Sequence, residues 1–184
     1  MRPGRVLLLA LALSVATALA DAAPRRAASA RGPSEGPSSD LFAGYSYTHA
    51  GEASLNGWGL SGSYRLRGAL SLVADLSGHY GSFAGASLGE LGFMAGARWS
   101  GRAGPFRPFA EGLLGGVRTS VDVADASVSD ADTDWGFAFG GGADYPFSRR
   151  WAARGLVHLR LLHGQGTWDA DPRFSVGVVY RLRR

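Results

Sequence analysis

The chain contains no cysteine and no lysine, so its strongly basic side chains are 19 arginines. Without cysteine there is no disulfide, thiolate nucleophile or cysteine-ligated metal, and without lysine there is no Schiff base or phosphate-loop lysine. Charge is scarce too, because only 18% of the 184 residues are charged. Glycine is abundant instead, with 28 residues, which is about twice its usual share of roughly 7%. Without a collagen period, this indicates a glycine-rich β architecture or disorder.

The first 20 residues have the pattern of an export signal. Arg2 and Arg5 precede an apolar stretch over 6–16, and Ala18-Leu19-Ala20 has the small residues of a cleavage site. A membrane-anchoring helix is the alternative, but the apolar stretch is shorter than the ~20 residues that span a bilayer. We therefore predict a signal peptide over 1–20 and an exported protein.

Residues 21–40 contain three prolines among Ala, Ser, Gly and Arg, a composition that cannot bury enough surface to fold. They are predicted to be a disordered linker that precedes a domain over 41–184. That domain carries 14 arginines and 12 acids. A nucleic-acid-binding domain would show a basic face, so the high isoelectric point is no argument for such a partner and none is expected.

Beyond residue 40, no uncharged apolar run is long enough for a membrane helix. Apolar residues alternate instead with small, polar or charged ones, which is the period of a strand with two different faces. The pattern predicts eight strands, near residues 41–49, 55–66, 69–80, 88–99, 106–119, 135–147, 151–163 and 172–182.

The segment 151–163 shows the two faces clearly. Val157 and Leu159 fall on one face, and Arg154 and Arg160 fall on the other. The charged face is rich in Gly, Ala and Ser across the eight segments, which is unusual for a solvent surface. Such small residues suit the interior of an eight-stranded barrel, which has room only for packed side chains. A water-soluble lipocalin-type barrel is the rival, and it would have its large apolar side chains inside.

Aromatic residues at both ends of the apolar face favour a membrane barrel, because membrane interfaces select two aromatic belts. Trp58, Tyr80 and Trp135 lie toward one rim, and the other rim has Tyr64, Trp99, Tyr145, Phe147, Trp151 and Tyr180. The sequence therefore predicts an all-β fold: an eight-stranded antiparallel up-and-down transmembrane β-barrel with a filled polar interior.

The connections predict an orientation. Those at 67–68, 101–105 and 148–150 are short, and those around 51, 82–86, 121–134 and 164–171 are mostly longer, as expected for short periplasmic turns and longer outer loops. Arginines gather at the short-turn end and acids at the long-loop end. Arg118 and Arg173 are the exceptions on the acidic side.

Three stretches carry a family resemblance: Gly44-Tyr45-Ser46-Tyr47, Leu55-Asn56-Gly57-Trp58 and Val73-Ala74-Asp75-Leu76-Ser77-Gly78-His79-Tyr80-Gly81. With them, residues 41–184 resemble the outer-membrane β-barrel domain family, a broad OmpA-like and porin-family grouping. The resemblance implies residence in the cell outer membrane, contact with its lipid and lipopolysaccharide, and insertion by the barrel-assembly machinery. It carries no shared catalytic residues. Strands of this kind commonly end the chain on an aromatic, whereas here Tyr180 is followed by residues 181–184.

The predicted interior holds a charge cluster with a structural role. Unpaired charges in a narrow lumen would be costly, so carboxylates and guanidinium groups should pair there. The same groups could instead form a narrow ion path or, less simply, a catalytic acid and base. The cluster consists of Asp75, Glu90, Glu111, Asp144, Arg98, Arg154 and Arg160, with Arg65, His79 and His158 nearby.

Other motifs do not support a metal or cofactor. Asp130, Asp132 and Asp134 offer oxygen ligands at alternate positions, but the spacing of the following Gly136 and the absence of a later Glu exclude an EF-hand, leaving only a looser calcium site open. The four histidines lack zinc spacing, and the glycine runs lack the lysine and helix of a phosphate loop. We expect no cofactor.

The preferred function is a non-enzymatic envelope or surface-interaction component acting through its outer loops, whose ligand the sequence does not identify. A small gated pore is one alternative. A lipid A-modifying enzyme is another, and its only candidate rim group is His163, Thr167, Asp169 and Ser175.

Overall fold

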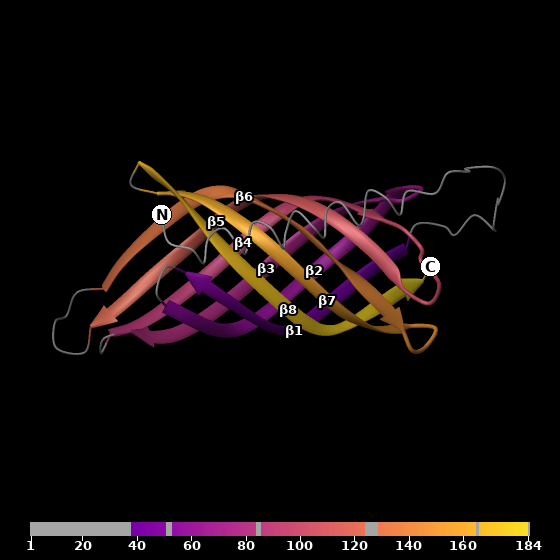
Figure 1. Ribbon diagram of the computed structural model, residues 1–184, viewed down its shortest axis with the longest axis horizontal. Coiled ribbons are helices and arrows are strands. Elements are labelled where there is room, and N and C mark those ends of the chain that lie inside the picture. The colour runs from indigo at the N-terminus through magenta and orange to yellow at the C-terminus, as the bar shows by residue number, and fades with distance from the viewer. Residues whose placement is uncertain (1–37, 51–52, 84–85, 124–128, 165, 184) are drawn as a thin grey trace, which may run out of the picture. The chain divides into compact units, whose positions relative to one another are not determined.

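The computed structural model describes residues 38–50, 53–83, 86–123, 129–164 and 166–183. The predicted signal peptide and most of the predicted linker lie outside these residues. The described chain forms eight antiparallel strands, each paired with the next along the chain, and β8 pairs with β1 to close a barrel (Figure 1). The strands are β1 (Ser38–Ala50), β2 (Ala53–Arg67), β3 (Leu70–Phe83), β4 (Ala86–Ser100), β5 (Arg107–Val123), β6 (Ser129–Pro146), β7 (Trp151–Gly164) and β8 (Thr167–Arg183). The predicted all-β eight-stranded barrel is confirmed. In the described part of the chain, no helix is long and apolar enough to cross a membrane.

The closing pair of strands settles how β8 ends. It runs from Ser38 opposite Arg183 to Thr48 opposite Arg173, with Leu41 opposite Tyr180. The ladder thus continues past Tyr180, and β1 begins at Ser38, inside the segment predicted to be a linker. Pairing with each other satisfies the edge groups of both strands, which a membrane requires because hydrocarbon offers no hydrogen bonds.

We call the end where β1 begins and β8 ends the terminal end, and the opposite end the distal end. Connections at the terminal end span 68–69, 101–106 and 147–150, whereas those at the distal end span 51–52, 84–85, 124–128 and 165–166. The predicted contrast between short and longer connections is therefore wrong. The strands continue into the segments expected to be loops.

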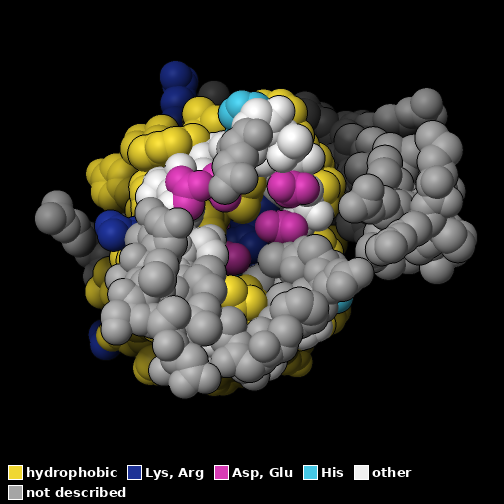
Figure 2. All heavy atoms as spheres, turned by 90° about the vertical axis from the view of Figure 1, so that its left-hand side faces the viewer, with side chains coloured by type: hydrophobic (Ala, Val, Ile, Leu, Met, Phe, Trp, Pro, Cys, Tyr) yellow, Lys and Arg dark blue, Asp and Glu magenta, His cyan; other side chains and the backbone are white. Residues whose placement is uncertain are grey.

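The acidic segment 122–134 shows why. Asp122 pairs with Ser129 and Asp132 with Thr119, so most of the segment belongs to β5 and β6. Residues 167–171 likewise belong to β8. Asp and Gly are rare in isolated strands, but here the neighbouring strand satisfies their backbone groups. Figure 2 shows acidic side chains gathered around a depression at the distal end, with basic side chains deeper inside.

The apolar faces point outward. Phe137, Phe139 and Val157 are 38%, 46% and 46% exposed, whereas Glu90 and Arg160 are 6% and 1% exposed. A lipocalin-like barrel requires the reverse and is excluded. The outward surface is instead suited to hydrocarbon, as in outer-membrane barrels.

Two aromatic belts border this outward surface. Trp58, Tyr80, Trp135 and Trp168 are exposed toward the distal end, and Tyr64, Trp99, Tyr145, Phe147 and Trp151 toward the terminal end. On β6, Trp135 and Tyr145 are ten residues apart. At ~3.4 Å per residue and a tilt of about 45°, that is roughly 24 Å along the barrel axis, the height of the apolar band in such proteins.

The interior is less uniformly polar than the sequence predicts. Two groups of buried apolar side chains also fill it. One consists of Val73, Met94, Leu113, Val117, Ala138 and Leu162, and the other of Phe42, Phe109, Ala152, Leu156 and Val179. Charged and apolar side chains together close the lumen.

The β2–β3 turn needs a glycine. Gly68 has a φ of 57°, a left-handed conformation that costs little only without a Cβ. It reverses the chain between Arg67 and Leu70, which pair directly. A register shift between Arg65 and Arg67 then moves the pairing by one residue, so that inward side chains of β2 such as Ser61 lie opposite inward side chains of β3 such as Asp75.

Candidate functional site: the interior ion-pair network

The seven residues of the predicted charge cluster all lie inside the barrel and are buried: Asp75, Glu90, Arg98, Glu111, Asp144, Arg154 and Arg160. They come from β3, β4, β5, β6 and β7. Alternation along each strand turns them inward, and the antiparallel register brings them to shared levels. Arg98 is opposite Glu111 across β4 and β5, and Asp144 is opposite Arg154 across β6 and β7.

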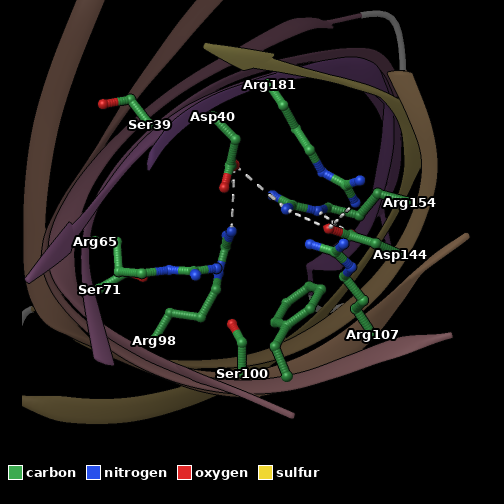
Figure 3. A pocket seen from close by; sticks show the side chains of 11 residues that line it. Ser39, Asp40, Arg65, Ser71, Arg98, Ser100, Arg107, Asp144, Arg154 and Arg181 are labelled. Carbon is green, nitrogen blue, oxygen red and sulfur yellow. Dashed lines mark hydrogen bonds and ion pairs between the residues drawn. The ribbon is translucent and has the colours of Figure 1, made fainter. Parts of the chain in front are cut away.

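Near the terminal end, two arginines bind three carboxylates, of which Figure 3 shows Asp40 and Asp144. Arg154 donates from Nε and Nη2 to the two oxygens of Asp144 at 2.7 and 3.0 Å. Arg98 donates from Nε to Glu111 at 2.6 Å. Asp40 joins the two pairs, at 3.6 Å from Arg98 and 3.3 Å from Arg154. The bidentate contact is the strong form of an arginine–carboxylate pair.

An aromatic ring supports the same two arginines. The guanidinium carbon of Arg98 is 4.5 Å from the ring centre of Phe109, and that of Arg154 is 4.9 Å from it. Arg154 also lies 5.6 Å from the ring centre of Phe42. A cation over an aromatic face gains electrostatic attraction that partly replaces its lost hydration.

At mid-depth, a histidine connects two ion pairs. His158 Nε2 lies 2.6 Å from Glu111, and Arg173 donates to His158 Nδ1 at 2.8 Å. Arg173 also donates to Asp75 at 2.7 Å. A guanidinium group can only donate, so Nδ1 must accept and the ring proton lies on Nε2, facing Glu111.

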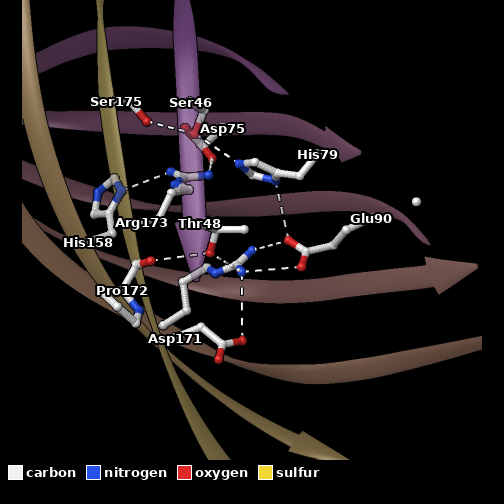
Figure 4. Close-up of polar contacts among 12 residues, drawn as sticks. Ser46, Thr48, Asp75, His79, Glu90, His158, Asp171, Pro172, Arg173 and Ser175 are labelled. Atoms are coloured by element: carbon white, nitrogen blue, oxygen red, sulfur yellow. Dashed lines mark hydrogen bonds and ion pairs between the residues drawn. The ribbon is translucent and has the colours of Figure 1, made fainter. Parts of the chain in front are cut away.

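Toward the distal end, a second chain of contacts crosses the lumen (Figure 4). Arg160 hydrogen-bonds Glu90, donates to Thr48 at 2.9 Å and lies 3.7 Å from Asp171. On its other side, Glu90 lies 3.4 Å from His79 Nδ1.

Beyond Glu90, this chain has the connectivity of a hydrolase site. His79 Nε2 is 2.9 Å from the hydroxyl of Ser46, so a serine, a histidine and Glu90 follow one another in the order of a nucleophile, base and orienting acid. Yet His79 Nδ1 makes no hydrogen bond to Glu90, so the acid does not orient the ring. Ser46 and His79 are 0% exposed, however, and Ser46 also hydrogen-bonds Ser175 at 2.9 Å. As arranged here, the hydroxyl has no exposed surface to offer a substrate.

Three network residues were missed by the sequence reasoning: Asp40, assigned to the linker, and Asp171 and Arg173, assigned to the acidic outer end. Asp171 and Arg173 are buried in the interior. The alternation was the available signal. Phe174 and Val176 face outward, so the alternation turns Arg173, and Asp171 two residues before it, inward.

The rim group considered for lipid modification is not assembled. His163, Thr167 and Asp169 are exposed at the distal end, whereas Ser175 is buried inside the barrel. His163 packs against Trp168, with ring centres 4.9 Å apart. The four candidates therefore do not share one surface.

The described residues contain no group of three or more His, Asp or Glu side chains placed to hold a metal ion. Asp132 and Asp134 belong to β6, while Asp130 has no described side chain. His79 and His158 lie inside the barrel, and His163 lies at its distal rim.

Comparison with known proteins agrees with this architecture. The family model described as "outer membrane protein beta-barrel domain" matches residues 6–181. The chain belongs to this outer-membrane β-barrel family. As a family member, it is an integral outer-membrane barrel in contact with membrane lipid and lipopolysaccharide, and the predicted resemblance is confirmed. No curated protein sequence matches it significantly.

Solved structures show the same fold at low sequence identity. Neisserial surface protein A aligns with a TM-score of 0.61 at 16% identity, over 80% of this chain and 97% of that one. Ail, the attachment invasion locus protein of Yersinia pestis, aligns with 0.58 at 14% identity, over 79% and 99%. OprG of Pseudomonas aeruginosa aligns with 0.57 at 14% identity, over 80% and 97%. Ail is also known in complex with the heparin analogue sucrose octasulfate.

Proposed function

We propose that this outer-membrane barrel is a non-enzymatic envelope component whose interior is a structural plug and whose distal rim is its interaction surface. The pairing inside the barrel carries the proposal. Each of the seven predicted interior charges contacts an opposite charge, and Asp40, Asp171 and Arg173 extend the network. Removing one member leaves another charge buried without compensation, so the network favours a closed barrel.

A plugged barrel is distinguished from a pore by its conductance. Eight strands enclose only enough space for packed side chains, and Arg98, Arg154 and Arg160 occupy that space here. In planar bilayers we expect no steady single-channel current from the wild type or from Glu90→Gln. A steady current that changes on neutralising Glu90 or Arg154 would support a pore and contradict the plug.

The acidic distal rim limits the partners of this surface. Asp132 and Asp169 are exposed there, and Asp134 is half-buried beside them. Repulsion opposes a polyanion at such a rim. We therefore expect sucrose octasulfate, the ligand seen with Ail, not to bind this rim, and propose contact with cationic groups or with lipopolysaccharide through divalent ions. Equilibrium binding at low and high salt tests this.

Placement in the outer membrane is tested first. Cells producing the full chain are fractionated, and the protein is run on a detergent gel before and after boiling. A closed barrel should be recovered in the outer-membrane fraction. On the gel it should run at one position before boiling, when it is folded, and at another after boiling, when it is unfolded. Recovery in the soluble fraction without detergent would contradict the proposal. Insertion by the barrel-assembly machinery is proposed with it, and depletion of that machinery should abolish the folded band.

A further inference from the structure

A small cavity lies inside the terminal end of the barrel, at the level of the Arg98 and Arg154 pairs. Its volume is about 50 Å³. One water needs about 10–15 Å³ of such space, so the cavity holds a few waters or one small ion. Five arginines from five strands line it: Arg65, Arg98, Arg107, Arg154 and Arg181 (Figure 3).

The charges around this cavity do not balance among the described residues. Asp40 and Asp144 are the acids that line it, and Glu111 contacts Arg98 from just above. Arg65 has an interaction of its own and is left out of the balance. The other four guanidinium groups thus face three carboxylates, an excess of one positive charge. Arg107 has no hydrogen bond or ion pair to another described side chain and is drawn without one in Figure 3.

Hydrogen-bond donors at the cavity are also left over. Arg98 Nη1, Arg154 Nη1 and Arg181 Nη2 are buried and have no hydrogen-bond partner. The ion-pair distances from Arg98 Nη1 to Asp40 and from Arg181 Nη2 to Asp144 are 3.6 and 3.9 Å, too long for hydrogen bonds. Arg98 and Arg154 are 3% and 2% exposed, so bulk solvent does not readily replace the missing acceptors.

A small oxyanion would satisfy both deficits at once. Water can accept hydrogen bonds from the three donors, but it cannot neutralise the excess charge. A phosphate carries up to two negative charges at neutral pH and presents acceptors in several directions, and guanidinium forks match its geometry. Ser71 and Ser100 also line the cavity and offer hydroxyl donors.

We infer that the terminal cavity is a binding site for one small tetrahedral oxyanion of the phosphate class. The size of the cavity limits the ligand to the free ion, because a sugar or nucleotide attached to the phosphate would not fit. The bound ion completes the ion-pair network at the end of the barrel where the chain closes. Binding to the folded state alone raises stability with ligand concentration.

The protein is purified from outer membranes in a zwitterionic detergent. It is then titrated with inorganic phosphate in a calorimeter at constant ionic strength. We expect one phosphate per chain, and a thermal midpoint that rises with phosphate but not with chloride at the same ionic strength. Sulfate should compete, and glucose 6-phosphate should not. Equal effects of chloride and phosphate, or an absence of heat, would show that the cavity holds only water and would overturn the inference.

Variants locate the ion. Arg107→Gln and Arg181→Gln remove cavity arginines and should each weaken phosphate binding by about tenfold or more. Arg149→Gln is the matched control, because Arg149 is exposed in a connection at the same end and does not line the cavity. Boiled and unboiled gel bands establish that each variant folds, and Arg181→Gln replaces Arg107→Gln if the latter does not. Unchanged binding in a folded cavity variant, or equal loss in Arg149→Gln, contradicts the site.

Discussion

Arg160 shows how much a single interior residue contributes to this barrel. It is 1% exposed and is shared between Glu90, Thr48 and Asp171. Arg160→Met removes the charge but keeps much of the side-chain volume, so Glu90 is left buried without its guanidinium partner. We expect a loss of about 3–5 kcal/mol in the free energy of unfolding, measured by urea denaturation in micelles.

The double variant Glu90→Gln/Arg160→Met separates the charge effect from packing. Removing both members of the pair relieves the uncompensated charge, so the double variant should be more stable than Arg160→Met alone. A double variant that is as unstable as the sum of the two single variants would show that packing, not pairing, accounts for the loss.

Gly140 illustrates a residue whose absence of a side chain makes space for the network. A Cβ at Gly140 would lie 2.0 Å from the carbonyl oxygen of Val157 and 2.8 Å from the ring of His158. Gly140→Ala must therefore displace the β7 backbone at Val157 and His158, and we expect a destabilisation of about 1–3 kcal/mol. Gly155→Ala is the control, because a Cβ there meets nothing within 4 Å. Equal unfolding midpoints for the two variants would contradict this reasoning.

At the scale of the element, β8 tests the membrane-facing surface. Val176 and Leu182 lie on the same outward face, and Val176 is well inside the belt residue Tyr180 while Leu182 is beyond it. Arginine on the lipid face costs about 2–4 kcal/mol at mid-membrane and about 0–1 kcal/mol near the interface. Val176→Arg should therefore destabilise the barrel in lipid vesicles by the larger amount, and Leu182→Arg by the smaller.

The two variants should differ much less in a soluble barrel, whose outer surface faces water. Equal unfolding free energies for Val176→Arg and Leu182→Arg in vesicles would thus contradict a membrane-spanning β8. Folding yield is followed on the same gel by the unboiled band.

Alternation made the middle of each strand predictable, but not its ends. The period of two separated Val157 and Leu159 from Arg154 and Arg160, and the small residues of the charged face together with the aromatic belts then gave the direction of each face. At the distal ends the sequence becomes rich in Asp, Ser and Gly, which in isolation indicate a loop. Only pairing with a neighbouring strand keeps such residues extended, and a single segment does not reveal that pairing.

At the scale of the whole molecule, the crowding of acids at the distal rim predicts a dependence of stability on pH. Asp134 lies beyond the belt residue Trp135, outside the lipid-facing band. Burial raises the pKa of Asp134 above its ordinary value near 4, and the negative charges of Asp132 and Asp169 raise it further. The folded barrel therefore retains this proton to a higher pH than the unfolded chain, and stability declines as the pH rises through the interval between the two pKa values.

Asp132→Asn removes the larger of the two repelling charges and keeps an oxygen that can accept from the backbone N–H of Thr133. We expect the pKa of Asp134 to fall toward its value in the unfolded chain. The loss of stability as the pH rises between those two pKa values should therefore become smaller. Asp169→Asn should act in the same direction with a smaller effect. An NMR titration of the Asp134 carboxyl group measures both shifts, and an unchanged pKa in Asp132→Asn would contradict the assignment.

The sequence by itself determined the class of the barrel, the direction of its two faces and the interior location of seven charged residues, because these depend on the period of a strand and on which side chains tolerate lipid. The tertiary structure decided which charges meet. Asp40 of β1 contacts Arg98 of β4 and Arg154 of β7. Arg173 of β8 contacts Asp75 of β3 as well as His158 of the neighbouring β7. Barrel closure brings these strands, which are far apart in the sequence, around one lumen. Register and closure are properties of paired strands, so no single segment contains them.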